Sequence, residues 1–181
     1  MKHTLFLIAS ARENGNSETL ALEAAKSLPA DQQTWLRLQN LPLEPFADIR
    51  HSVGVYPQPT GNAKILFDAS LAASDIVMIA PVYWYSVPAT LKRYLDEWSA
   101  WMRVPEANFK ARMAGKTIWI ISSLSGEISD AEPLLGTLER SAKYMGMRVG
   151  GHVIGNGSKP GDVNSDHAAL EAARRLFGGP A

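Results

Sequence analysis

The alternation of apolar runs with helical patterns constrains the fold of this chain more than any other feature. Five short apolar runs are typical of strands, at residues 5–9, 34–38, 76–80, 117–121 and 149–154. Helical periodicity fills the gaps, at residues 18–28, 63–73, 89–102, 131–145 and 166–177. Such alternation forms a parallel sheet with helices on both faces and right-handed crossovers. The sequence therefore predicts a three-layer, doubly wound α/β fold with strand order 2-1-3-4-5.

Length and composition limit the classes of protein that this chain can belong to. We expect 181 residues to form a single domain over residues 1–181. Lys plus Arg and Asp plus Glu both count 18, so no net field recruits nucleic acid or an anionic membrane. The absence of cysteine excludes thiol catalysis and cysteine-ligated zinc or iron–sulfur clusters. The first apolar run is too short for a signal peptide or a membrane span, so we expect a cytoplasmic protein.

A polar turn separates the first expected strand from the first expected helix. It reads Ser10-Ala11-Arg12-Glu13-Asn14-Gly15-Asn16-Ser17. N–H groups at a helix N-terminus lack internal partners, and the helix dipole favours negative charge there. Ser10 and Ser17 can donate to phosphate oxygens, Arg12 can add a charge-assisted contact, and Gly15 and both asparagines tolerate a tight backbone. The turn predicts a phosphate site; alternatively, it is an ordinary turn in which Asn16 or Ser17 caps the helix.

A second loop follows the third expected strand and carries three consecutive aromatic residues. It reads Pro81-Val82-Tyr83-Trp84-Tyr85-Ser86-Val87-Pro88. The two prolines stiffen the loop, and rings outside the core can cover a planar apolar ligand while their polar tips reach water. We interpret residues 81–85 as such a cover. Alternatively, one or two of the rings roof the core or a subunit interface.

A third loop, after the fourth expected strand, is small and polar. It reads Ser122-Ser123-Leu124-Ser125-Gly126-Glu127. Hydroxyl residues and glycine let a backbone approach a ligand closely and offer donors to ring carbonyls. Ligands of doubly wound sheets bind beyond the carboxyl ends of strands at the switch point, and all three loops follow the strands around that point. We therefore expect the three loops to form one site.

Together these motifs resemble those of the flavodoxin-like NAD(P)H-dependent flavin and quinone oxidoreductases. The phosphate loop of that family, S-x-R-x-x-G-N-S, matches residues 10–17, and its P-V-Y-W segment matches residues 81–84. The following helix carries the family's lysine at Lys92. Residues 73–75 and the Gly-Lys pair at 115–116 fit as well. The resemblance covers about residues 3–155 and implies the flavodoxin-like fold.

The resemblance implies an FMN enzyme with NAD(P)H as co-substrate. The FMN phosphate would lie on the first loop, and the isoalloxazine ring against the second and third loops. FMN would accept hydride from NAD(P)H and reduce a quinone, a free flavin or a similar acceptor in a ping-pong mechanism. The flavin carries this chemistry, so no catalytic side chain is expected. The expected cofactor-binding residues are Ser10, Arg12, Asn14, Gly15, Asn16, Ser17, Pro81, Val82, Tyr83, Trp84, Tyr85, Ser122, Ser123, Ser125 and Gly126.

Two other functions remain open at this point. A flavodoxin-type electron carrier would bind the same cofactor without oxidising NAD(P)H itself. Such carriers are usually strongly acidic so that they dock on basic partners, whereas the charges of this chain balance. The third possibility is a binding module that keeps only the fold, and the intact phosphate loop counts against it.

Two glycine-containing patterns lie outside the expected site. Ala114-Gly115-Lys116-Thr117 ends like a Walker motif, but Lys110 stands in place of the leading glycine, and the segment enters a strand. Both departures argue against the binding of a nucleoside triphosphate at this segment. Residues 155–161 resemble a dinucleotide fingerprint but lack the acidic residue on a following strand, so we interpret them as a plain loop.

The helix expected over residues 89–102 bears on assembly. Its apolar stripe, at helical spacing, predicts core packing and consists of Leu91, Tyr94, Leu95, Trp98 and Met102. Trp101 falls off this stripe, so Trp98 and Trp101 together are candidates for a subunit contact, since aromatic residues anchor interfaces. Members of the resembled family also assemble through this helix, and we therefore expect a homodimer or homotetramer.

The segment from residue 40 to residue 61 contains four prolines and is too long for a simple connection. It either walls the site or crosses the surface. The four histidines fall in separate elements without the spacing of metal ligands, so we expect no metal site.

Overall fold

Parallel pairing of buried apolar strands forms the central layer of the computed structural model, which describes residues 2–178. Its five strands run in the order β2-β1-β3-β4-β5, and every neighbouring pair is parallel. This confirms the doubly wound order expected from the sequence. The strands are β1 (Thr4–Ile8), β2 (Gln33–Arg37), β3 (Asp75–Pro81), β4 (Thr117–Leu124) and β5 (Arg148–Asn156).

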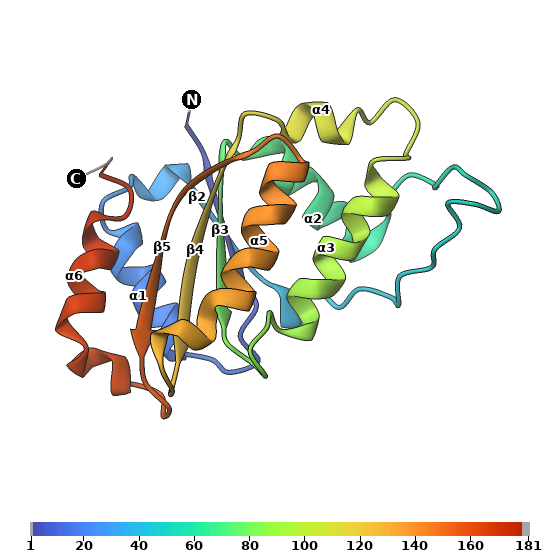
Figure 1. Ribbon diagram of the computed structural model, residues 1–181. Helices are drawn as coiled ribbons and strands as arrows, with labels where there is room; N and C mark the ends of the chain where they lie inside the picture. The colour runs from blue at the N-terminus through green and yellow to red at the C-terminus, as the bar shows by residue number, and fades with distance from the viewer. Residues whose placement is uncertain (1, 179–181) are drawn as a thin grey trace.

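Helices cover both faces of the sheet (Figure 1). One face carries α1 (Asn16–Ala25) and α6 (His167–Arg175). The other carries α2 (Gly61–Ala72), α3 (Ala89–Trp101) and α5 (Glu132–Tyr144). The sequence patterns did not indicate the short helix α4 (Phe109–Met113), because a five-residue helix is too short to show a period. Short 3-10 turns lie at Ala30–Gln32, Leu38–Asn40, Ile128–Ala131 and Asp162–Ser165.

The two tryptophans proposed as a subunit contact are core residues instead. Trp98 is 4% exposed and Trp101 is 1% exposed. Trp101 packs edge-on against Tyr94 and Phe67, with ring centroids 5.7 and 5.5 Å apart. The interpretation was wrong because Trp101 follows Trp98 by three residues and so continues the same buried helical face.

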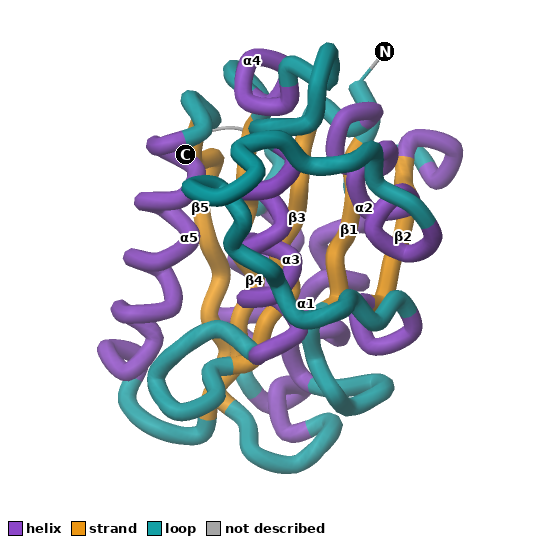
Figure 2. Tube along the Cα trace, turned by 90° about the vertical axis from the view of Figure 1, so that its right-hand side faces the viewer, coloured by secondary structure: helices purple, strands orange, loops and turns teal. Residues whose placement is uncertain are grey.

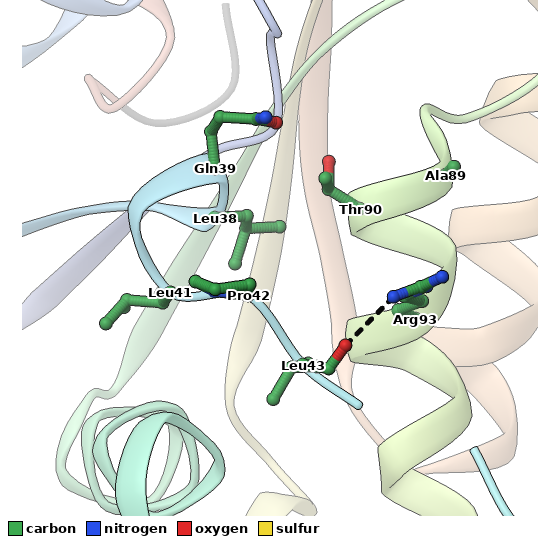
Figure 3. A pocket seen from close by; sticks show the side chains of 8 residues that line it. All are labelled: Leu38, Gln39, Leu41, Pro42, Leu43, Ala89, Thr90 and Arg93. Atoms are coloured by element: carbon green, nitrogen blue, oxygen red, sulfur yellow. Dashed lines mark hydrogen bonds between the residues drawn. The ribbon is translucent and has the colours of Figure 1, made fainter. Parts of the chain in front are cut away.

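The long segment after β2 crosses the surface and does not wall the cavity described below. It projects from the body beside α3 (Figure 1). Arg93 on α3 donates through Nη1 to the Leu43 carbonyl at 2.9 Å, beside a hollow of about 310 Å³ (Figure 3). Farther along the segment, the Tyr56 hydroxyl donates to the Ala47 carbonyl, and the Tyr56 ring stacks on Phe46. The Arg93 contact ties the start of the segment to α3, and the Tyr56 contacts are internal to the segment.

Register places the ends of the strands at one edge of the sheet, where Figure 2 shows their loops gathered. Pro81 at the end of β3 pairs with Ser123 of β4, and Leu124 of β4 pairs with Asn156 of β5. The Ala9 amide, just past β1, donates to the Ile79 carbonyl of β3. The loops after β1, β3, β4 and β5 therefore begin side by side.

Candidate functional site

A cavity of about 220 Å³, the cofactor cavity, opens where these four loops meet. This position, beyond the carboxyl ends of parallel strands around the switch point, is the usual ligand site of a doubly wound sheet. Three of the loops are those expected from the sequence. The lining residues are Ser10, Arg12, Gly15, Asn16, Ser17, Pro81, Val82, Tyr83, Ser123, Leu124, Ser125, Gly157, Ser158 and Pro160.

The N-terminus of α1 points its free N–H groups at this cavity. Gly15 is the N-cap residue, in extended conformation, and no side chain caps the helix. The first N–H of the helix that donates to a backbone carbonyl is that of Thr19, so within the described residues the N–H groups of Asn16, Ser17 and Glu18 donate to no backbone carbonyl. Neither Asn16 nor Ser17 is therefore the helix cap, so the capping role in the alternative interpretation was wrong. Unpaired donors and the helix dipole make this position suited to an anion.

Two side chains at the N-terminus of α1 differ in their hydrogen bonding. Ser17 is 1% exposed and lines the cavity, and its hydroxyl forms no hydrogen bond within residues 2–178. Asn16 is committed to structure, because its Nδ2 donates to the Lys159 carbonyl and its Oδ1 accepts from the Gly161 amide, both at 3.0 Å. Ser17 is thus the side chain with free hydrogen-bonding capacity, whereas Asn16 holds the neighbouring loop.

Ser10 and Arg12 form a rigid bend at the mouth of the cavity. The Ser10 hydroxyl donates to the Arg12 carbonyl at 3.0 Å and accepts from the Arg12 amide at 3.1 Å. Arg12 Nη1 donates to the Ser158 carbonyl at 2.9 Å, while the rest of this exposed guanidinium keeps N–H groups for a ligand. The Ser10 proton is therefore engaged, and Arg12 links the first loop to the loop after β5.

Charge at this end of α1 is balanced by an ion pair. Glu18, in the first turn of the helix, lies 2.6 Å from Arg37 Nη2. Arg37 also donates to the Arg12 carbonyl at 3.2 Å. Because Arg37 offsets the Glu18 carboxylate, the negative charge does not oppose an anion at the helix N-terminus.

The loop after β5 is the part of the site that sequence reasoning missed. Gly157, Ser158 and Pro160 line the cavity, although we interpreted residues 155–161 as a plain loop. A Cβ at Gly157 would lie 2.6 Å from Nδ2 of Asn16, so only glycine fits this close approach. The expected strand order could have indicated that this loop lies at the site, since a loop after β5 starts beside the end of β4.

The aromatic loop has an unusual backbone. Tyr83 and Ser86 exchange two backbone hydrogen bonds of 3.1 Å around a tight turn. The two central residues, Trp84 and Tyr85, have φ values of 50° and 61°. This left-handed region is unfavourable for bulky residues, by about 1–2 kcal/mol each. The backbone of the two aromatic residues of this turn is therefore strained.

Trp84 and Tyr85 lie outside the core, contrary to the alternative that they roof it. They are 94% and 57% exposed. They line an open groove of about 310 Å³, the aromatic groove, together with Val82, Leu124, Ser125, Gly126 and Asp130. Val82, Leu124 and Ser125 also line the cofactor cavity, so the two hollows adjoin. Gly126, expected at the site, lines this groove.

Two of the expected site residues do not line either hollow. Ser122 is fully buried, and its hydroxyl donates to the Ala80 carbonyl at 2.7 Å. It points into the sheet because adjacent residues of a strand face opposite sides, and Ser123 is the one that reaches the cavity. Asn14 is exposed, with a φ of 53°, and its amide donates to Glu18 Oε2 at 3.0 Å. Asn14 therefore shapes the turn.

Metal binding and membrane insertion are two further possibilities for residues 2–178. No group of three or more His, Cys, Asp or Glu side chains is placed to share a metal ion there. In the same part of the chain, no helix is both long enough and apolar enough for a membrane span.

The sheet order and the helix N-terminus at its switch point define a flavodoxin-like protein. The chain belongs to the family of the flavodoxin-like fold, whose sequence model matches residues 2–177. It is 32% identical over 169 residues to YwqN of Bacillus subtilis (strain 168), covering 92% of this chain and 91% of YwqN. The name of that relative assigns it as an NAD(P)H-dependent FMN-containing oxidoreductase.

Solved structures share the same architecture. The Trp repressor binding protein of Bacillus subtilis superposes with a TM-score of 0.78 at 26% identity, over 96% of this chain and 97% of that one. An FMN-dependent NADH-azoreductase of Bacillus anthracis, solved in complex with FMN, superposes with a TM-score of 0.62 at 17% identity. The match covers 97% of this chain and 99% of the azoreductase, and shows that the fold is shared.

Proposed function

We propose that the protein is an FMN-dependent oxidoreductase that passes a hydride from NAD(P)H to a small-molecule acceptor. The observation that carries this proposal is the uncapped N-terminus of α1, which offers free N–H groups and the Ser17 hydroxyl to the cofactor cavity. The relationship to YwqN, which is named for FMN and NAD(P)H, supports the same cofactor and co-substrate.

The residues present fit the two ends of FMN. Phosphate requires donors and positive potential, which the α1 N-terminus, Ser17 and Arg12 provide. A planar ring requires flat apolar cover and donors, for which Tyr83, Val82 and the loop at residues 123–126 are suited. Bound FMN supplies the hydride chemistry, and the protein supplies position and electrostatics.

The aromatic groove is the proposed place for the substrates. Its exposed rings, Trp84 and Tyr85, offer flat surfaces on which nicotinamide or a quinone can stack. The groove adjoins the cofactor cavity on one side, so donor and acceptor would occupy it in turn. Sequential use of one groove supports a ping-pong mechanism with a quinone, a free flavin or a similar compound as acceptor.

Anaerobic stopped-flow of the FMN-loaded protein with NADH and with NADPH tests the proposal. We expect at least one nicotinamide to bleach the visible flavin absorbance, with free FMN at the same concentration as the control. Steady-state rates at several quinone concentrations should then give parallel double-reciprocal lines. Failure of both nicotinamides to reduce the flavin would favour an electron carrier, and intersecting lines would exclude the ping-pong mechanism.

A further inference from the structure

A second cavity lies at the opposite end of the sheet from the cofactor cavity. This basal cavity, of about 590 Å³, is formed where β3, β4 and β5 begin, below α4. Strand β4, eight residues long, separates the two cavities by about 23 Å of extended chain. Its charged lining residues are Lys2, Asp75, Arg112, Lys116 and Arg148.

The basal cavity concentrates positive charge in a chain whose net charge is zero. Within the described residues, Arg112, Lys116 and Arg148 form no ion pair. Asp75 is the one acidic residue in the lining, so it offsets only one of these positive charges, and its buried carboxylate also accepts from Trp119 Nε1 and from the Ser74 hydroxyl, both at 2.9 Å. Among residues 2–178, its one ion-pair partner is Lys2, at 3.9 Å.

Lys116 lines this cavity and is fixed in place by hydrogen bonds to the end of α2. Its Nζ donates to the carbonyls of Leu71, at 2.9 Å, and Ala73, at the C-terminal end of α2. Burial lowers the pKa of Lys116, and the positive charge of Arg112 lowers it further. A bound anion would favour the charged form of Lys116 and would weaken the repulsion between Lys116 and Arg112.

The Walker-like stretch at residues 114–117 lines this cavity but has no free backbone donors. All four of its N–H groups donate to carbonyls of the chain, at 2.9–3.2 Å. A Walker loop binds phosphate through such N–H groups, so the structure agrees that the motif is not a nucleotide loop. A ligand of this cavity would be bound by side-chain charges.

We propose that the basal cavity binds a small multivalent oxyanion through Arg112, Lys116 and Arg148. Three cations that line one cavity match an anion with several charges, such as a pyrophosphate or a tricarboxylate. The volume lies within the range of small-molecule sites. The site is separate from the flavin site and does not depend on the proposed reaction.

Isothermal titration of the FMN-saturated protein with pyrophosphate, and separately with citrate, tests this proposal at low ionic strength. Saturation with FMN protects the phosphate loop, and flavin absorbance reports any displacement. The double variant Arg112→Gln/Arg148→Gln should weaken binding about tenfold or more. The matched control, Arg103→Gln/Arg140→Gln, removes two exposed arginines elsewhere and should leave the affinity unchanged.

Binding of either oxyanion that depends on Arg112 and Arg148 supports the proposal, and the two titrations show which chemistry is preferred. Equal losses in both double variants would show that the effect is net charge alone and would overturn it. So would the absence of heat with both probes at millimolar concentration, or displacement of the flavin. Added salt should weaken the binding, since exposed charges are screened.

Discussion

Neighbouring residues in the first turn of α1 make different contacts. Ser17 presents a free hydroxyl to the cofactor cavity, whereas Asn16 connects α1 to the loop at residues 157–161. Cofactor affinity and loop stability can therefore be separated by single substitutions one residue apart.

Replacing Ser17 with alanine should weaken FMN binding without lowering the stability of the apoprotein. A hydrogen bond to a charged group contributes about 1.5–3 kcal/mol, so we expect Kd for FMN to rise about tenfold or more. Fluorescence titration and thermal melting measure the two quantities. Asn16→Ala is the matched comparison and should lower the melting temperature, because it leaves the Gly161 amide without its acceptor. Unchanged FMN affinity in Ser17→Ala would contradict the assignment.

Glu97 on α3 should make stability depend on pH. Its half-buried side chain has a raised pKa, because burial disfavours the carboxylate and the charge of Asp96 adds to this. A raised pKa in the folded state means that the protonated acid is favoured there. Its contribution is thus present at low pH and is lost as pH rises through the folded pKa.

Glu97→Gln should therefore have a higher melting temperature than the parent chain at pH 7. The difference should shrink as pH falls toward the unfolded pKa of glutamate, about 4.3. Melting curves over this range measure it. A difference that stays constant with pH would assign the effect to packing instead of charge.

At the scale of elements, the turn that contains Trp84 and Tyr85 has a strained backbone. Tight turns with positive φ at both central residues prefer Asn-Gly, and two exposed aromatics in their place cost stability. Backbone strain is often found at functional sites, and we therefore expect these rings to contact the flavin or the substrates.

Converting this turn with Trp84→Asn/Tyr85→Gly should stabilise the protein by about 1–2 kcal/mol while impairing function. We expect the fluorescence of bound FMN to rise, because ring packing no longer quenches it, and turnover with bulky quinones to fall. Trp84→Ala should show the optical change and part of the loss of turnover, without the full gain in stability. A lower melting temperature together with a smaller oligomer would place the rings at a subunit interface instead.

At the scale of the whole molecule, cavities lie at both ends of one sheet, and the apolar layers between them are buried on both faces. FMN should stabilise this whole unit, since a ligand of the folded state shifts the unfolding equilibrium. A homodimer or homotetramer remains a prediction, and light scattering of the FMN-loaded protein would measure its mass.

FMN at 100 times its Kd should raise the melting temperature by about 5–11 °C. This follows from about 2.7 kcal/mol of linkage and about 2–4 °C per kcal/mol for a domain of this size. Riboflavin at the same concentration should shift it much less, because it lacks the phosphate that α1 and Ser17 would hold. Calorimetry with both flavins makes the comparison, and equal shifts would contradict a phosphate site.

Much of this architecture can be predicted from local sequence patterns. Strand runs and helical periods define the sheet order, because parallel strands joined by right-handed crossovers admit few arrangements. The loops of Ser17, Tyr83 and Ser123 follow from that order, since all three begin at the carboxyl edge. The turn at residues 10–17 is a local motif, and five of its residues line the cavity, which agrees with its predicted place at the site.

Only the tertiary structure decided which side chains face the site. Ser122 turns into the sheet and Ser123 toward the cavity, although their sequence context is almost the same. Trp101 lies in the core, and the glycine of the loop after β5 lies against Asn16, through contacts between distant segments. The sequence by itself determined the strand order, because this depends on local periodicity and on the handedness of the crossovers, and it predicted a phosphate site in the turn after β1. Side-chain direction and loop contact depend on packing between segments far apart in the chain, which local patterns do not encode.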